Sequence, residues 1–307
     1  MRINTNMAAL NAWRSMTVNN NAMTKSLEKL SSGYRVNRAA DDAAGLAVSE
    51  KMRAQIRGLN MAIRNAQDGV SLVQTAEGGA QKIQDMLQRM RELAVQANSG
   101  TLQDSDKQLL QKEFSQLQEE ITRTAQTTKF NEIALAQVFQ ADGVTPITTP
   151  GGTATISIQV GPGATDQDKI SITISDLRAE MLGKTTGGNF KSIKDLNIST
   201  PVEYDTDGTT VKTPAGAETA IQVIDEALTT LSKVRADFGA VQNRLEAAIE
   251  TLQIQSENLT AAESRIRDVD MAQEMATFTK YQILQQASTA MLAQANQSTQ
   301  AILSLLR

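Results

Sequence analysis

The sequence predicts a mainly α fold, in which long antiparallel coiled-coil-like helical rods run from both chain ends and a small insert contains a β-hairpin. Apolar residues recur at steps of three and four over long stretches of each half, as in helices that pack along a seam. All five prolines lie between Pro146 and Pro214, where they do not interrupt these stretches. Aromatic residues make up only 3% of the chain, which is typical of long helices rather than of a large globular core.

The apolar pattern of the N-terminal half predicts two helices. Residues 56–94 keep the three-and-four rhythm with one irregular step near Val73, and a helix of this length would extend roughly 60 Å. A second apolar stripe follows within residues 105–128. Because residues 98–101 (NSGT) interrupt the pattern between the two helices, we expect an αα-hairpin. The second stripe consists of Leu110, Phe114, Leu117 and Ile121.

The C-terminal half repeats this organisation. Residues 221–269 form one long seam with an irregular step at Leu231, and the chain connectivity suggests that this rod packs antiparallel to the first. Shorter apolar stripes follow in residues 23–34 and 284–306, near the two chain ends. An isolated amphipathic helix is only marginally stable in water, so each end helix needs the other or a neighbouring chain.

The middle of the chain, residues 141–217, has a different pattern. TATISIQV and KISITIS alternate apolar and polar residues and are joined by GPGATDQD, which predicts a β-hairpin at about residues 153–175. Residues 185–214 are expected to form a loop or a small, poorly cored insert.

The composition excludes several kinds of chemistry. The chain has no His and no Cys, so it contains neither a Ser-His-Asp triad nor the zinc-protease motif H-E-x-x-H, and a zinc site of the usual ligands is excluded. The net charge of −4 argues against a nucleic-acid partner. We find neither an apolar run of membrane-spanning length nor the pattern of a Sec-type signal peptide at the N-terminus. We therefore expect no enzyme, no cofactor, no metal site and no membrane partner.

Long stretches at both ends resemble bacterial flagellin. The N-terminal stretches are MRINTNMAALNAW, which opens the chain, and LSSGYRVNRAADDAAGLAVSEKMRAQIRGLN in residues 30–60. Those of the C-terminal half are FGAVQNRLE in residues 238–246, ENLTAAESRIRDVDMAQEM in residues 257–275 and ASTAMLAQANQSTQAILSLLR in residues 287–307. The resemblance covers about residues 1–140 and 218–307.

The resemblance implies a structural subunit that polymerises into the flagellar filament used for swimming. It assigns residues 1–40 with 271–307 to an inner tube of terminal helices. Residues 41–184 with 215–270, including the hairpin, would form the helical rods of an outer tube, and residues 185–214 a short variable surface segment. A related alternative is a hook–filament junction protein, which shares this helical architecture.

The resemblance also implies a location and several partners. The chain would be exported unfolded through the flagellar type III channel and become part of the secreted, extracellular filament. Besides itself, its implied partners are the export chaperone, which would bind the C-terminal helix, the filament cap protein and the hook–filament junction proteins.

The stretch RAADDAAGLAVSEKMR, in residues 38–53, carries the first candidate site. Asp41 and Asp42 are adjacent carboxylates, but adjacent helical residues diverge by about 100°, which disfavours an acid pair or a metal site. One of them is expected to cap the helix that begins near Ala43. A third interpretation is a salt bridge between subunits that involves Arg35 or Arg38, and the pattern does not decide which Asp has which role.

The second candidate site follows from the resemblance alone. QRMRELAVQ, in residues 88–96, resembles the flagellin segment that the vertebrate Toll-like receptor for flagellin recognises. Arg89, Leu93 and, across the αα-hairpin, Glu113 match its contact positions. The alternative is that the same three residues serve packing in the filament.

Overall fold

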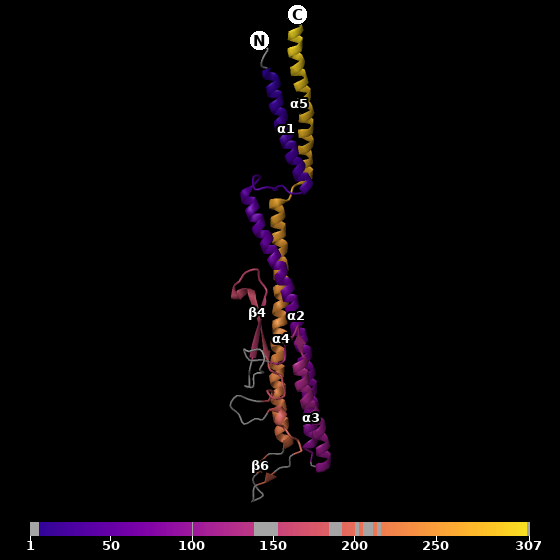
Figure 1. Ribbon diagram of the computed structural model, residues 1–307. Helices are drawn as coiled ribbons and strands as arrows, with labels where there is room; N and C mark the ends of the chain where they lie inside the picture. The colour runs from indigo at the N-terminus through magenta and orange to yellow at the C-terminus, as the bar shows by residue number, and fades with distance from the viewer. Residues whose placement is uncertain are drawn as a thin grey trace. The chain divides into compact units, whose positions relative to one another are not determined.

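The computed structural model describes residues 6–99, 101–137, 153–183, 192–199, 203–204, 211–213 and 216–305. The chain divides into two compact units (Figure 1). The terminal unit combines Met1–Arg57 with Gln255–Arg307, and the central unit is Gly58–Ile254. Two long helices, α2 (Ala43–Ala97) and α4 (Gly216–Arg267), contribute residues to both units.

The terminal unit is built mainly of α1 (Met7–Ser32) and α5 (Met271–Leu305), which lie side by side (Figure 1). Asn6 donates its side-chain amide to the carbonyl of Ala295 at 3.0 Å, and Asn19 donates to the hydroxyl of Ser288 at 3.1 Å. Residue numbers therefore rise along one helix as they fall along the other. The two end helices form an antiparallel pair, which is one of the two partners that their apolar stripes left open.

In the central unit α2 and α4 also run antiparallel, which confirms the predicted arrangement of the rods. Arg91 of α2 pairs with Asp225 of α4 at 2.7 Å, and further along the helices Arg235 pairs with Glu77 at 3.3 Å. A β-carbon on Gly69 would collide with the side chain of Ile158 and press on that of Leu245, so this glycine leaves room for both side chains.

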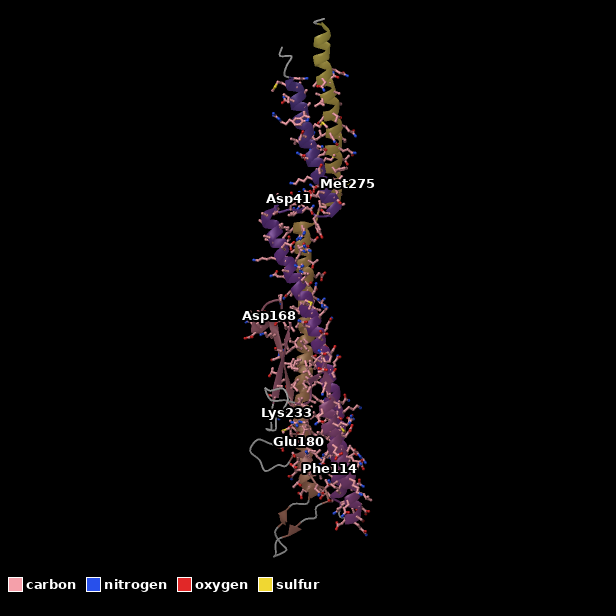
Figure 2. All side chains as sticks on the ribbon, viewed as in Figure 1. Asp41, Phe114, Asp168, Glu180, Lys233 and Met275 are labelled. Atoms are coloured by element: carbon pink, nitrogen blue, oxygen red, sulfur yellow. The ribbon has the colours of Figure 1, made fainter. Side chains whose placement is uncertain are left out.

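Helix α3 (Asp104–Thr127) completes the predicted αα-hairpin with α2. Asp104 and Asp106 lie in its first turn, where their charge opposes the positive end of the helix dipole. Within its apolar stripe Phe114 and Ile121 are buried in the core shared with α2 and α4, and Leu110 and Leu117 are half-buried against that core. Figure 2 labels Phe114. The largest fully buried side chains of these three helices include Ile83, Leu87, Met90, Phe114, Ile121 and Phe238.

The predicted β-hairpin is confirmed by β3 (Thr153–Gln159) and β4 (Lys169–Ser175), which pair antiparallel with Ile156 opposite Ile172. Isoleucines of β4 are buried in the core shared with α2 and α4. The connecting loop contains a short 3-10 helix, η1 (Asp166–Asp168), and Figure 2 labels Asp168 at its end. The Asp168 carboxylate accepts a hydrogen bond from the hydroxyl of Thr165 at 2.6 Å and holds the loop closed.

Two further strand pairs occur in the described chain. Strands β1 (Lys129–Phe130) and β2 (Ile133–Ala134) form a tight hairpin after α3, with Asn131 and Glu132 at positive φ of 47° and 67°. Such angles at both turn residues match the twist of a two-residue hairpin. Strands β5 (Glu203–Tyr204) and β6 (Val211–Thr213) form the other pair.

Residues 192–199 fall in the range expected to be a loop or a poorly cored insert, yet they are packed into the central core. Ile193 of the 3-10 helix η2 (Ile193–Asp195) and Ile198 are fully buried, and Leu196 is only 5% exposed. The buried amide of Gln118 on α3 donates to the carbonyls of Ile193 at 2.6 Å and Leu196 at 3.2 Å. These bonds satisfy backbone groups that a loop would otherwise leave unpaired. Most of the remaining range 185–214 lies outside the described residues.

Candidate functional site

The first candidate site is the joint of the terminal unit, made of the linkers 33–42 and 268–270. Helix α1 is capped at its carboxyl end by Gly33, whose φ of 74° lies in the left-handed region that glycine adopts at helix ends. The N–H of Arg35 then donates to the carbonyl of Arg267 at 2.6 Å, and the N–H of Val269 donates to the carbonyl of Gly33 at 3.0 Å. Backbone hydrogen bonds thus join the two linkers, although they are far apart in the sequence.

Asp42 is the residue that caps α2. Its carboxylate accepts a hydrogen bond from the N–H of Gly45 at 2.8 Å, and its carbonyl accepts the N–H of Leu46 at 3.0 Å. The bond to Gly45 satisfies an N–H group of the first turn that has no carbonyl partner within the helix. A β-carbon at Gly45 would collide with the Asp42 carboxylate, so the small residue after the cap is part of the arrangement.

Asp41 has a different set of partners. Lys25 of α1 donates to its carboxylate at 2.8 Å, and the backbone N–H groups of Arg38 and Asn37 donate at 3.2 and 3.4 Å. The hydrogen bond from Lys25 and those from the backbone lower the pKa of Asp41 below its usual value. The two carboxylates therefore serve separate partners and do not converge. Within the described part of the chain, no group of three or more acidic side chains is placed to hold a metal ion.

Arg35 and Arg38, the basic residues of the predicted joint, also have partners in their own chain. The guanidinium of Arg35 donates to the carbonyl of Ile266 at 2.7 Å, at the carboxyl end of α4 where the helix dipole favours a cation. Arg38 donates to the carboxylate of Glu28 at 2.8 Å, and 72% of its side chain is exposed. Arg35 thus fastens one linker to α4, while Arg38 remains accessible from outside.

Sequence reasoning missed a further part of this joint, centred on Arg267. Its guanidinium donates to Glu50 at 2.8 Å and lies over the ring of Tyr34, 4.8 Å from the ring centroid. The bond from Arg267 lowers the pKa of Glu50, and nearby Arg53 adds to this effect. No local motif signals this cluster, because Tyr34 lies in the linker after α1, Glu50 lies on α2 and Arg267 ends α4.

The α1–α5 pair carries the second notable surface, since many of its large apolar side chains are exposed. At about 100° per residue, Met275 and Leu284 lie on opposite sides of α5, and their exposed fractions are 50% and 37%. Figure 2 labels Met275 near the start of this helix. A helix that is apolar on more than one side requires neighbours on more than one side. The exposed apolar residues are Met7, Leu10, Trp13, Val18 and Leu27 on α1 and Met271, Met275, Ile283, Leu284 and Met291 on α5.

Comparison with known proteins identifies this architecture. Residues 3–139 match the bacterial flagellin N-terminal helical region, and residues 221–306 match the bacterial flagellin C-terminal helical region. A flagellin of Bacillus subtilis is 49% identical, and a flagellar filament 33 kDa core protein of Treponema phagedenis is 47% identical, each over 100% of both chains. This chain belongs to the bacterial flagellin family. The predicted resemblance is confirmed, and the chain is a structural subunit of the flagellar filament.

One solved structure shares this fold. A protein from Vibrio parahaemolyticus, described as a putative flagellar hook-associated protein, has a TM-score of 0.57 at 13% identity, over 74% of this chain and 100% of that one. This likeness concerns the fold alone. Flagellins self-associate into the extracellular filament. Among the described helices of this flagellin, none has a segment that is long and apolar enough to cross a membrane.

The residues that resemble the receptor-contact positions of flagellin lie on the hairpin of α2 and α3. The guanidinium of Arg89 pairs with Glu113 across the hairpin at 2.9 Å and with Glu92 along α2 at 2.9 Å. The hydrogen bonds that Arg89 donates to Glu92 and Glu113 raise the pKa of Arg89. About half of each of the Arg89 and Glu113 side chains is exposed, whereas Leu93 is only 1% exposed. The two charged residues are accessible, and Leu93 belongs to the core beneath them.

Proposed function

We propose that copies of this flagellin assemble through the α1–α5 pair, which would form the inner tube of the filament from residues 1–40 and 271–307. Residues 41–184 and 215–270 would then supply the rods of the outer tube, with residues 185–214 facing outwards. The observation that carries this proposal is the exposure of apolar side chains on opposite sides of α5. One partner helix covers one side only, so further copies of the chain are needed to cover the rest.

Energetics favour assembly over an isolated helix pair. Ordering a residue costs about 1–2 kcal/mol of backbone entropy, and burial returns roughly 25 cal/mol per Å² of apolar surface. Several contacts between α1 and α5 are polar hydrogen bonds, such as that of Asn19 with Ser288, each of which contributes little net stability. Apolar burial against neighbouring subunits would supply the stabilising free energy that the α1–α5 pair lacks on its own. Folding of the end helices is therefore coupled to polymerisation.

The joint residues Arg35, Arg38, Asp41 and Asp42 are proposed to bring this surface into contact with neighbouring subunits. Arg35 and Asp41 fasten the linkers within the chain. This would fix the position at which α1 meets a neighbouring subunit. Arg38 is the best placed of the four to reach another subunit, because most of its side chain is exposed and its partner Glu28 is itself on the surface. An exposed pair of this kind exchanges partners at little cost.

Substitution on opposite sides of α5 tests the assembly proposal. Met275→Asp and Leu284→Asp each place a charge on a surface that assembly would bury, so purified protein should stop forming filaments under negative-stain electron microscopy. The matched controls Met275→Leu and Leu284→Met keep the apolar character and should assemble normally. Normal filaments from both Asp variants would show that this surface is not the interface.

The exposed surface of α5 also supports further partners, which would bind before assembly or at the two ends of the filament. We propose that an export chaperone covers α5 during type III secretion, and that the filament cap and hook–filament junction proteins bind the α1–α5 pair at the two filament ends. Mixing the purified chain with the chaperone should protect α5 amides from hydrogen exchange and suppress polymerisation. Protection confined to the central unit would contradict this assignment.

A second proposed role is recognition by the host Toll-like receptor for flagellin through Arg89, Glu113 and the underlying Leu93. The exposed Arg89–Glu113 pair supports it, because arginine beside a carboxylate on a rigid helix pair is a suitable contact surface. Arg89→Ala and Glu113→Ala should each weaken receptor signalling by monomers about tenfold, which corresponds to roughly 1.4 kcal/mol. Arg123→Ala, which removes an exposed ion pair elsewhere on α3, is the control and should signal normally. If the unaltered monomer does not stimulate the receptor, this role is disproved.

A further inference from the structure

The methionines with the most exposed side chains lie mostly in the terminal unit. The chain has no cysteine and twelve methionines, so thioethers are its only sulfur groups. In the central unit Met90 is fully buried and Met181 is 9% exposed. On the α1–α5 pair four methionines are exposed by 48–64%, namely Met7, Met271, Met275 and Met291. Because oxidation of methionine depends on access to the sulfur, these four should react well before those in the core.

We infer that the exposed methionines of α1 and α5 form an oxidation site whose modification by peroxides prevents assembly of the subunit. This inference rests on the proposed role of the α1–α5 pair as the subunit interface. Hydrogen peroxide transfers one oxygen atom to the thioether. The sulfur–oxygen bond forms as the oxygen–oxygen bond breaks, sulfur loses two electrons, and the remaining oxygen leaves as water with both protons. A methionine sulfoxide reductase with a thiol reductant reverses this change.

The consequence follows from the polarity of the product. A thioether is apolar and adaptable, which suits a surface that neighbours will bury. A sulfoxide carries a strong hydrogen-bond acceptor, and burying such an acceptor without a donor is unfavourable. Each copy would bring four such groups into the interface. Oxidised subunits are therefore excluded from the growing filament, whereas methionines already buried by neighbours are protected.

Met61 provides a control within the same chain. It lies on α2 in the central unit, is 50% exposed, and has its thioether contacted by the guanidinium of Arg64. Its exposure is similar to that of Met275, but it is not on the α1–α5 pair. Oxidation of Met61 should therefore leave assembly unchanged.

The test treats purified full-length subunits with hydrogen peroxide, maps sulfoxides by peptide mass spectrometry and follows polymerisation by light scattering. We expect oxidation at the four terminal methionines and at Met61 but not at Met90 or Met181. The polymerisation rate should fall by about tenfold or more, and methionine sulfoxide reductase should restore it. The variant with Met7→Leu, Met271→Leu, Met275→Leu and Met291→Leu should assemble equally well before and after peroxide. Met61→Leu should remain as sensitive as the unaltered chain.

Several outcomes would overturn the inference. One is a chain that carries all four sulfoxides and still polymerises at the unmodified rate. Another is equal inhibition of the fourfold Leu variant. If that variant does not fold, failure of the reductase to restore polymerisation of the unaltered chain overturns the inference instead. Failure of untreated, unaltered protein to form filaments would contradict the proposed function, so the two failures are distinguishable.

Discussion

The two units of the chain contain similar helices but bury them differently. Along α4 the buried residues extend from Gly216 to Leu252, and none is found in the part of the helix that belongs to the terminal unit. In α1 the only buried side chain is that of Ser26. One continuous helix therefore passes from a complete core into a region where its own chain supplies too few neighbours. Regular apolar spacing specifies a helix, but a core also requires partners, and under the proposed function those of the terminal unit come from other subunits.

The largest expected difference between the units comes from removing one aromatic side chain from each. Phe114→Ala deletes a fully buried ring in the central unit and should lower the free energy of unfolding by about 3–5 kcal/mol. Trp13→Ala removes a ring that is 60% exposed on α1, so the monomer should unfold at nearly the same denaturant concentration. Its filaments, however, should dissociate at lower temperature than those of the unaltered chain. Guanidinium titration of monomers and light scattering of filaments measure the two effects, and a Trp13→Ala monomer as unstable as Phe114→Ala would remove the contrast.

Two ion pairs sharpen the same comparison. In the central unit the side chains of Arg178 and Asp176 are 5% and 3% exposed and lie 2.6 Å apart, and the hydrogen bond that Arg178 donates to Asp176 raises the pKa of Arg178. Arg178→Met would leave a buried carboxylate without its partner and should cost about 3 kcal/mol of unfolding free energy. In the terminal unit the Lys25–Asp41 pair has an exposed lysine, so Lys25→Met should leave monomer stability nearly unchanged.

A double variant is the control for the buried pair. Replacing both partners, by Arg178→Met with Asp176→Leu, removes the uncompensated charge and should recover most of the lost stability. If the double variant is as unstable as Arg178→Met, the loss comes from packing or from other bonds of the arginine.

The sequence predicts the parts of this structure that depend on local periodicity. The rods follow from apolar residues at steps of three and four, and the hairpin of β3 and β4 follows from strict alternation. The packing of residues 192–199 was not predicted, because it depends on the Gln118 side chain bonding to carbonyls that are distant in sequence. The Arg267 cluster was missed for the same reason. Asp41 and Asp42 have identical capping propensity, and only the path of the linker selects Asp42.

The role of Asp42 as the cap of α2 leads to a prediction with a smaller expected effect. Asp42→Ala removes the cap of α2 and should cost about 1 kcal/mol, with faster hydrogen exchange at the amides of Gly45 and Leu46. Asp42→Asn keeps an acceptor and should retain most of the protection. If Asp42 also contacts a neighbouring subunit, Asp42→Ala weakens filaments more than it weakens the monomer. Equal losses in both would assign it to capping alone.

The smallest expected effect is that of acid on the joint. The folded pKa of Asp41 lies below its usual 3.8, and that of Glu50 lies below its usual 4.5. A depressed carboxylate pKa means that the charged form favours the folded state, so its contribution is complete above the usual value and is lost as the pH falls through the folded value. The joint should therefore loosen in the range that begins near pH 4.5 for Glu50 and near 3.8 for Asp41 and continues below them.

Hydrogen exchange of residues 33–42 and 268–270 at neutral and acidic pH measures this loosening directly. The variant Asp41→Asn with Glu50→Gln removes both charges at every pH, so it should exchange faster at neutral pH and show a much smaller change on acidification. Amides of the central core, such as that of Phe114, should stay protected over the range in which the joint responds, because apolar burial does not depend on these two carboxylates. Equal acid sensitivity of the double variant would mean that other groups control the joint. Loss of core protection in parallel with the linkers would show that the two units unfold as one, and the distinction between them would then not extend to their stability.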